Sequence, residues 1–222
     1  MYLVGLTGGI AAGKSTVAAR LVQRGAELVD ADDVAREIVL PGTDGWREIV
    51  EAFGRAVLDE DGFVDRGELA REVFYDESKR ALLNEITHPR ITEEIAERLE
   101  VLAPFDGMVV LDIPLLAELG LDREHDPAKR STPHYDAIVV VAAQRDTQME
   151  RLQQQREMSP SEAAARIDAQ ASMDEKLALA DHVIWNEGTL AQLGTEADRV
   201  ADELIAAARD KAARAEQGLP ND

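Results

Sequence analysis

The chain has 222 residues, of which 45% are hydrophobic and 31% are charged, a composition typical of a globular protein with one main core. Its net charge of −20 disfavours binding to nucleic acids, and any anionic substrate must be met by a local cluster of arginine, lysine and helix N-termini. The lack of cysteine excludes disulfides, thiolate catalysis and cysteine-ligated metal sites. No signal peptide or bilayer-length apolar run is recognisable, so we expect a cytoplasmic protein without membrane contact.

The first forty residues have the pattern that opens an α/β domain with a parallel sheet. The expected elements are a strand at 2–6, a glycine loop, a helix at 16–24, a strand at 26–29, an acidic turn and a helix through residue 39. Gly25 ends the first helix, and Asp32 or Asp33 can cap the second, which Pro41 and Gly42 end.

Residues 44–103 are expected to be mostly helical and to form a lobe between two strands of the sheet. Three apolar stripes with helical spacing are assigned to the core: Trp46, Ile49, Val50 and Phe53; Leu69, Val73 and Phe74; and Ile91, Ile95 and Leu99. His88 and Pro89 lie between two helical stretches, and this pair of residues suits the start of a helix.

The rest of the chain is expected to complete the sheet and its covering helices. Strands are expected at 108–113, 137–141 and 183–185, and helices at 147–155, 161–171 and 190–208. A polar stretch at 122–134 is interpreted as a surface insertion without a catalytic role, and the tail at 214–222 is expected to fray.

Residues 8–15 match the Walker A pattern in full, in the order Gly8-x-x-x-x-Gly13-Lys14-Ser15. The motif also has its required setting, with a strand before it and a helix after it. Glycines let backbone N–H groups approach phosphate oxygens, and the helix N-terminus adds a positive partial charge. Lys14 supplies a mobile cation for the β- and γ-phosphates, and the Ser15 hydroxyl can bind Mg²⁺. The motif predicts nucleotide phosphate chemistry but does not identify the acceptor.

Two acidic positions follow strands, where ligands bind in open α/β sheets. Asp32 lies in the turn after the second strand, and Asp112 ends the strand that starts at Met108. One carboxylate could accept a proton from an acceptor hydroxyl, and the other could help to hold Mg²⁺ through water. Helix capping is the alternative explanation for the aspartates between residues 30 and 33, and the two roles are compatible.

Three further polar residues have both a functional and a structural interpretation. His88 can contact a substrate, although a single histidine is more often structural. Arg151 and Arg156 flank a glutamine-rich stretch, and arginines on a mobile flap could stabilise a transferring phosphoryl group. A solvated helix surface is the alternative for both arginines, and these residues by themselves favour it.

Several short motifs occur in order between about residues 2 and 205. They are Leu6-Thr7-Gly8-Gly9-Ile10 with the glycine loop, Asp30-Ala31-Asp32, Asp65-Arg66, Thr87-His88-Pro89-x-Ile91, Asp112-Ile113-Pro114-Leu115-Leu116-x-Glu118, Gln148-x-x-Arg151, Arg166-Ile167-x-x-Gln170 and Ala180-Asp181-x-Val183-Ile184-x-Asn186-x-Gly188. The glycine loop alone is generic, but this combination resembles the dephospho-CoA kinase family of P-loop kinases.

The resemblance implies an α/β P-loop fold of the nucleoside-kinase type, with three α/β/α layers, a central parallel sheet, a helical substrate-binding lobe and a small lid. One domain would span residues 1–222, with a core at about 1–40, 105–150 and 181–210, a CoA lobe at 41–104 and a lid at 151–172. The implied reaction is the phosphorylation of the ribose 3′-hydroxyl of dephospho-CoA by ATP with Mg²⁺, which yields coenzyme A. ATP and dephospho-CoA are the expected partners of a monomer or weak homo-oligomer.

The resemblance also assigns roles to individual residues. Lys14, Asp32 and Arg156 are the expected catalytic residues, with Asp32 as the base and Arg156 as the lid arginine. ATP would be bound by Gly9, Ile10, Ala11, Ala12, Gly13, Lys14, Ser15 and Thr16, with Arg156 on the phosphates and Asn186 near the adenine. The acceptor pocket would comprise Thr7, Asp32, Arg66, His88, Pro114, Leu115 and Leu116, and the metal would be held by Ser15 and, through water, by Asp112.

The chain departs from the family pattern in the glycine loop and in the lid. Family loops commonly read Gly-Ser-Gly-Lys, whereas this loop has Ala11-Ala12-Gly13-Lys14, so Ala11 must accept backbone angles that suit glycine better. The lid has glutamines at 153–155 where basic residues are common, which leaves Arg156 as the expected lid arginine. The alternatives are another small-molecule kinase, of nucleotide or shikimate type, and a non-catalytic P-loop regulatory protein.

Overall fold

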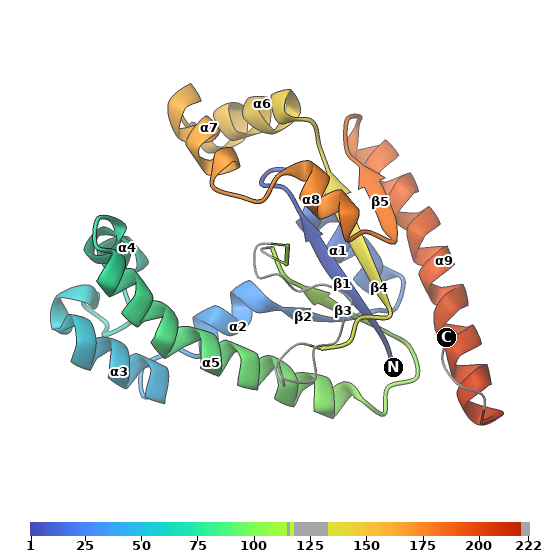
Figure 1. Ribbon diagram of the computed structural model, residues 1–222, viewed down its shortest axis with the longest axis horizontal. Helices are drawn as coiled ribbons and strands as arrows, with labels where there is room; N and C mark the ends of the chain where they lie inside the picture. The colour runs from blue at the N-terminus through green and yellow to red at the C-terminus, as the bar shows by residue number, and fades with distance from the viewer. Residues whose placement is uncertain (115, 118–132, 219–222) are drawn as a thin grey trace. The chain divides into compact units, whose positions relative to one another are not determined.

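The computed structural model describes residues 1–114, 116–117 and 133–218, and it divides into two compact units. The first unit comprises residues 1–29 together with the chain from residue 102 onward, and the second comprises residues 30–101. Figure 1 shows the helices and strands of both units.

A five-stranded sheet forms the centre of the first unit, in the order β2-β3-β1-β4-β5 (Figure 1). The strands are β1 Tyr2–Gly8, β2 Glu27–Asp30, β3 Met108–Asp112, β4 Ala137–Ala142 and β5 His182–Trp185. β1 pairs in parallel with β3 and β4, and β4 pairs in parallel with β5. The inner strands are almost continuous buried runs, as a sheet covered on both faces requires. The predicted parallel sheet is confirmed, and β1 lies at its centre.

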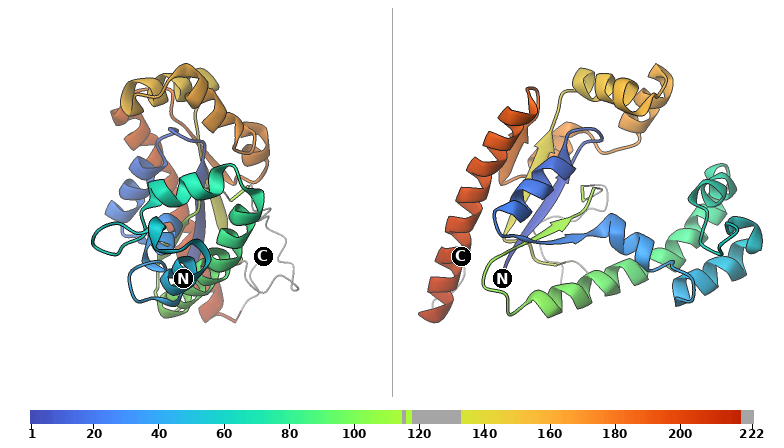
Figure 2. Two further views of the ribbon diagram at one scale, coloured as in Figure 1. Left: turned by 90° about the vertical axis from the view of Figure 1, so that its left-hand side faces the viewer. Right: turned by 180° about the vertical axis from the view of Figure 1, so that it is seen from behind.

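Helices cover both faces of this sheet. α1 (Lys14–Gln23) and α9 (Leu190–Glu216) pack together on one face, and α8 (Met173–Ala178) lies against β4 on the other (Figure 2). The main core consists of apolar side chains of the sheet, α1 and α9, among them Leu6, Leu21, Val139, Ile184 and Leu204. α6 (Arg145–Arg156) and α7 (Pro160–Asp168) pack against each other.

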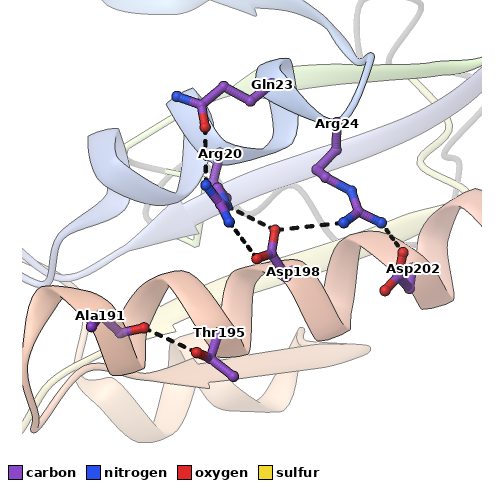
Figure 3. Close-up of polar contacts among 7 residues, drawn as sticks. All are labelled: Arg20, Gln23, Arg24, Ala191, Thr195, Asp198 and Asp202. Carbon is purple, nitrogen blue, oxygen red and sulfur yellow. Dashed lines mark hydrogen bonds and ion pairs between the residues drawn. The ribbon is translucent and has the colours of Figure 1, made fainter.

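Arg20 of α1 and Arg24, which caps the C-terminus of α1, face two aspartates of α9 (Figure 3). Arg20 donates through Nε to Asp198 Oδ1 at 2.7 Å and through Nη2 to Asp198 Oδ2 at 2.5 Å, a bidentate pair with defined geometry. Arg24 lies with Nη1 3.8 Å from Asp198 Oδ1 and also pairs with Asp202. These contacts fix the position of α1, which carries the glycine loop at its N-terminus, along α9.

We expect Asp198→Asn to destabilise the protein at neutral pH and to have a smaller effect in acid. The Arg20 guanidinium lowers the pKa of the Asp198 carboxyl below its ordinary value, so the contribution of this pair to stability is present above about pH 4 and is lost as the pH falls through the folded-state pKa. Urea unfolding at about pH 7 and about pH 3 would measure the difference between wild type and variant. Asp210→Asn, at an exposed position of the same helix, is the matched control. An equal destabilisation at both pH values would contradict the prediction.

The second unit is a small helical body with its own core. Its elements are α2 Ala31–Glu37, α3 Asp44–Phe53, the short 3₁₀-helix η1 Arg55–Val57, α4 Arg66–Phe74 and α5 Glu77–Leu102. Ile49, Val57, Leu69 and Ile86 form the buried cluster, with Phe53 and Val73 packed against it. The expectation that residues 44–103 are mostly helical is confirmed. The assignment of Phe74 to the core is wrong, because this ring ends α4 and is 69% exposed, edge-on to Tyr75.

Pro89 lies inside α5 and does not begin a helix, which corrects the expectation for the His88-Pro89 pair. A proline in a helix interior removes one backbone hydrogen bond and costs about 3 kcal/mol. The helix continues because Ile86, Ile95 and Leu99 are buried on either side of the proline and hold both halves.

Several other boundaries differ from the expectation. α2 begins at Ala31 with Asp30 as its N-cap and ends at Glu37, α7 ends at Asp168, and α8 was not expected. α9 continues to Glu216. The prediction that the chain frays from residue 214 is therefore wrong for residues 214–216, which are helical. The helix-forming Ala, Arg and Lys residues near its end explain the extension.

Most of the 122–134 stretch lies outside the described residues. No helix among the described residues is long and apolar enough to cross a membrane.

Tyr135 packs its ring against Gly5 of β1 and buries its hydroxyl group. A Cβ on Gly5 would lie 3.0 Å from Tyr135 Cδ1, and the hydroxyl finds no hydrogen-bond partner within the described part of the chain. The same burial raises the pKa of the Tyr135 phenol. An unpaired buried hydroxyl is unfavourable by about 1–3 kcal/mol.

We therefore expect Tyr135→Phe to leave the free energy of unfolding unchanged or to raise it by about 1 kcal/mol. Urea unfolding at neutral pH would measure the change, with Tyr75→Phe, at an exposed position, as the control. A clear loss of stability in Tyr135→Phe alone would show that the hydroxyl has a partner in the native protein.

Candidate active site

The glycine loop connects β1 to α1 at the carboxyl end of the central strand. β1 lies between β3 and β4, so side chains that follow these two strands flank the loop. Gly13 is the N-cap of α1 and has no side chain to cap the helix, which leaves the first backbone N–H groups of α1 available to an anion. This position is the one at which open α/β sheets bind ligands.

Two left-handed residues shape the loop. Ala11 has φ 57° and Gly13 has φ 96°. Alternation of right- and left-handed residues turns successive N–H groups toward one point and makes an anion-binding nest. The expectation that Ala11 adopts a conformation better suited to glycine is confirmed.

The glycines of the motif are required by close contacts as well as by backbone angles. A Cβ on Gly8 would lie 2.4 Å from the carbonyl oxygen of Val141 in β4, and one on Gly13 would lie 2.5 Å from Nδ2 of Asn186. Neither neighbour can move freely, because the first is backbone and the second is a buried side chain. The first glycine of the pattern is therefore explained by the approach of β4.

Lys14 forms an ion pair with Asp112 at the end of β3. Asp112 is 2% exposed and is the register partner of Leu6, which precedes the loop by two residues in β1. The ammonium group of Lys14 is thus held at the carboxyl end of the sheet beside the loop. Ser15 and Thr16 follow in the first turn of α1, and both are exposed.

The turn after β3 is tied to β1 through Thr7. Thr7 Oγ1 donates to the carbonyl oxygen of Pro114 at 3.1 Å, and Thr7 is fully buried. Leu116 is also fully buried. Leu115, which was assigned to the acceptor pocket, lies outside the described residues.

Three side chains donate hydrogen bonds to backbone carbonyl oxygens of the glycine loop. Gln148 and Arg151 of α6 donate to the carbonyl oxygens of Ile10 and Ala11, and Asn186 donates to that of Ala12. Arg151 therefore contacts the loop, and the solvated-surface interpretation of this residue is wrong. Sequence reasoning gave Gln148 no role. The only signal was the spacing of three residues that places Gln148 and Arg151 on one face of α6.

Arg156 is the last residue of α6, and its side chain is exposed. Glu157 follows in a left-handed conformation, with φ 52°, and ends the helix. Arg156 thus lies at the tip of the helix pair α6–α7, whereas Arg151, one turn and a half earlier, contacts the loop.

Asp32, Arg66 and His88 belong to the second unit and are exposed. The Asp30 carboxylate caps α2, accepting from the backbone N–H groups of Asp32 at 2.8 Å and Asp33 at 3.3 Å. Asp33 pairs with Arg36. Within the described residues the Asp32 carboxylate makes no hydrogen bond or ion pair, so capping does not explain this side chain.

The described residues contain no cluster of three or more His, Asp or Glu side chains that could hold a metal ion. Ser15 and Asp112 offer the hard oxygen donors that Mg²⁺ prefers. Mg²⁺ in kinases is held by one or two such groups together with the substrate phosphates, and the residues beside the loop fit that arrangement.

The model of one protein family, described as dephospho-CoA kinase, matches residues 2–192. The chain belongs to the dephospho-CoA kinase family. It is 46% identical over 205 residues to a dephospho-CoA kinase of Streptomyces avermitilis, covering 92% of this chain and 95% of that one. It is 44% identical to a dephospho-CoA kinase of Thermobifida fusca, covering 92% and 96%.

Solved structures agree with this membership of the dephospho-CoA kinase family. A dephospho-CoA kinase from Campylobacter jejuni matches with a TM-score of 0.64 and 25% identity over 92% of this chain and 97% of that one. The TT1252 structure from Thermus thermophilus matches with a TM-score of 0.72 and 31% identity over 91% and 97%. The expected α/β P-loop kinase fold and the family resemblance are confirmed, and the chain is a kinase.

Proposed function

We propose that this protein transfers the γ-phosphoryl group of ATP to the ribose 3′-hydroxyl of dephospho-CoA, which yields ADP and coenzyme A in the last step of coenzyme A biosynthesis. The observation that carries the proposal is the family match over residues 2–192, with a complete glycine loop inside it. Membership of this family sets aside the nucleotide-kinase, shikimate-type and regulatory alternatives.

Phosphate binding is assigned to the glycine loop and α1. The N–H groups of Ala11 and Gly13, the first N–H groups of α1 and the ammonium group of Lys14 are assigned to the phosphates, because those of Ile10 and Ala12 already donate to Gln170 and to the Gly9 carbonyl oxygen. Lys14 would exchange its contact with Asp112 for the β- and γ-phosphate oxygens. Ser15, with Asp112 acting through water, would hold Mg²⁺. When bound, this ion neutralises charge on the phosphates.

The transfer step is assigned to Asp32. Its carboxylate accepts the proton of the 3′-hydroxyl as the bond from that oxygen to the γ-phosphorus forms and the bond from the γ-phosphorus to the bridging oxygen of ADP breaks. Arg156 offsets negative charge on the transferring group. The freedom of the Asp32 carboxylate from structural contacts within the described residues supports this role.

The remaining assignments concern the two substrates. Arg66, His88, Pro114 and Leu115 are assigned to the proposed acceptor pocket, and the turn at Asn186 would lie near the adenine. Thr7 and Leu116 are fully buried, so they would support the turn at Pro114 without lining the pocket. Because the protein carries a net charge of −20, the two anionic substrates depend on local cations such as Lys14, Arg66 and Arg156. We propose a monomer or weak homo-oligomer that acts on these small molecules.

An ADP-release assay with MgATP tests the proposal, run without acceptor and with dephospho-CoA, shikimate or a nucleoside monophosphate. We expect ADP release that requires dephospho-CoA, and coenzyme A as the product. ADP release that requires one of the other acceptors would refute dephospho-CoA as the acceptor, but the protein would still be a kinase. Binding of ATP with no turnover for any acceptor would refute the proposed reaction.

A further inference from the structure

Three consecutive carbonyl groups of the glycine loop each accept a hydrogen bond from a different side chain. Gln148 Nε2 donates to Ile10 O at 2.8 Å, Arg151 Nη1 donates to Ala11 O at 3.1 Å, and Asn186 Nδ2 donates to Ala12 O at 2.9 Å. We call Gln148, Arg151 and Asn186 the carbonyl clamp. Its members come from α6 and from the residue after β5, more than 130 positions from the loop in sequence.

Two members of the clamp are buried, Arg151 is partly buried, and the three are connected to one another. Gln148 and Asn186 are each 5% exposed, which places them among the few buried polar residues of the described chain. Arg151 also donates through Nη2 to the carbonyl oxygen of Asn186 at 2.8 Å, so α6 and the turn after β5 are joined at the loop. Buried polar side chains stay favourable only when they are paired, so each member depends on its loop carbonyl.

The geometry of the peptide bond gives these contacts a consequence for phosphate binding. In a planar trans peptide, the C=O of one residue and the N–H of the next point in opposite directions. Holding the carbonyls of Ile10, Ala11 and Ala12 against the clamp therefore turns the N–H groups of the residues that follow them away from it. The Ala12 N–H donates to the Gly9 carbonyl oxygen at 3.0 Å and closes the turn of the loop, so the donors left for the phosphates are those of Ala11 and Gly13. A flipped peptide would direct a carbonyl oxygen, with its negative partial charge, toward the phosphates.

The loop needs such support because its backbone is not in a favoured conformation. Ala11, with φ 57°, lies in the left-handed region that residues other than glycine seldom adopt. A flip of the peptide next to Ala11 would relieve this conformation. Gly13, with φ 96°, has the freedom of glycine and no preference of its own for the bound geometry.

We infer that Gln148, Arg151 and Asn186 are positioning residues that hold the peptide groups of the loop so that the N–H donors of Ala11 and Gly13 are directed at the phosphates of ATP. This inference rests on the proposed function, since it concerns the loop that binds the donor nucleotide. Gln170 adds a second contact at Ile10, because the Ile10 N–H donates to Gln170 Oε1 at 2.8 Å. The connection between α7 and α8 is thereby joined to the same loop.

Near-isosteric substitutions remove the donors with little change of shape. Gln148→Glu and Asn186→Asp place a carboxylate oxygen against a carbonyl oxygen, and Arg151→Lys keeps the charge but loses the planar group that reaches two carbonyls. Gln148→Met is a neutral variant that also lacks the donor. The control is Gln154→Glu on α6, where the exposed glutamine donates to Glu150 and makes no other side-chain hydrogen bond among the described residues.

The test measures the affinity of the full-length protein for three ligands by calorimetry, together with its melting temperature. The ligands are ATP, inorganic tripolyphosphate and dephospho-CoA. We expect Gln148→Glu and Asn186→Asp to weaken ATP and tripolyphosphate about tenfold each, the usual effect of one lost buried hydrogen bond, with dephospho-CoA affinity unchanged. Gln148→Met should weaken them in the same direction, and Gln154→Glu should match wild type.

Two results would overturn the inference. One is wild-type affinity for tripolyphosphate in all the clamp variants. The other is an equal loss of affinity for all three ligands together with a fall in melting temperature, which would make the clamp a general structural contact. A wild-type protein that binds ATP and tripolyphosphate but not dephospho-CoA would refute the proposed function. In that case, the affinities for ATP and tripolyphosphate and the melting temperature would still test the inference about the clamp.

Discussion

Lys14→Ala is expected to lower turnover by about 10³-fold, because it removes the cation that stabilises charge on the transferring phosphoryl group. The side chain is already held beside the loop by Asp112, so little rearrangement is needed when the phosphates arrive. Lys14→Arg should recover only part of the activity, because the guanidinium is larger and its fork has a different geometry. Steady-state kinetics with dephospho-CoA and MgATP would measure both variants.

A loss of activity in Lys14→Ala must be separated from a loss of stability, since Asp112 is buried and loses its contact with Lys14. The chain offers a matched control in Lys211, which pairs with Asp136 at 2.7 Å near the start of β1. Lys211→Ala breaks a second lysine–aspartate pair. This pair lies near the start of β1, whereas the glycine loop follows the end of the same strand. We expect it to lower the melting temperature and to leave turnover unchanged. Comparable turnover in the two alanine variants would remove Lys14 from the catalytic group.

The glycine loop could be predicted from the sequence because its determinants are local. The strand, the two glycines, the lysine and the helix that follows lie within about twenty consecutive residues, and each part has its own signal. The left-handed conformation of Ala11 was also predictable, since it follows from a residue that stands where the pattern favours glycine.

The contacts that support the loop could not be predicted in this way. The hydrogen bond from Gln148 to Ile10 joins residues 138 positions apart, and nothing near Gln148 distinguishes it from the solvent-facing Gln154 on the same helix. Asn186 was expected near the adenine, and its amide group donates to the loop instead of standing free for a ligand. Such pairings depend on the tertiary structure. The hydrophobic periodicity of the sequence and the secondary-structure propensities of its residues do not specify them.

Pro89 and Phe74 show how tertiary packing overrides local signals in the second unit. A proline normally predicts a helix boundary, but the buried side chains on both sides of Pro89 keep α5 continuous. Phe74 fits an apolar stripe by its spacing, yet α4 ends at this residue and the ring is exposed. Both predictions failed for the same reason. Sequence spacing does not show whether another part of the chain packs over a given side chain.

Asp32→Asn is expected to lower turnover by about 10²–10⁴-fold while ATP binding stays close to wild type. Asparagine keeps the shape of the side chain and removes its ability to accept a proton. The cap of α2 is provided by Asp30, so the helix should remain intact. A change in turnover can therefore be attributed to the carboxylate, and the KM for ATP should change little.

The three aspartates of this turn supply their own controls, because each has a different environment. Asp33→Asn removes an exposed contact with Arg36 and should leave turnover near wild type. Asp30→Asn retains a side-chain oxygen that can cap α2, so it should change stability little. If Asp32→Asn turns over near the wild-type rate, the 3′-hydroxyl must lose its proton to another group, and Asp32 is then a binding residue at most.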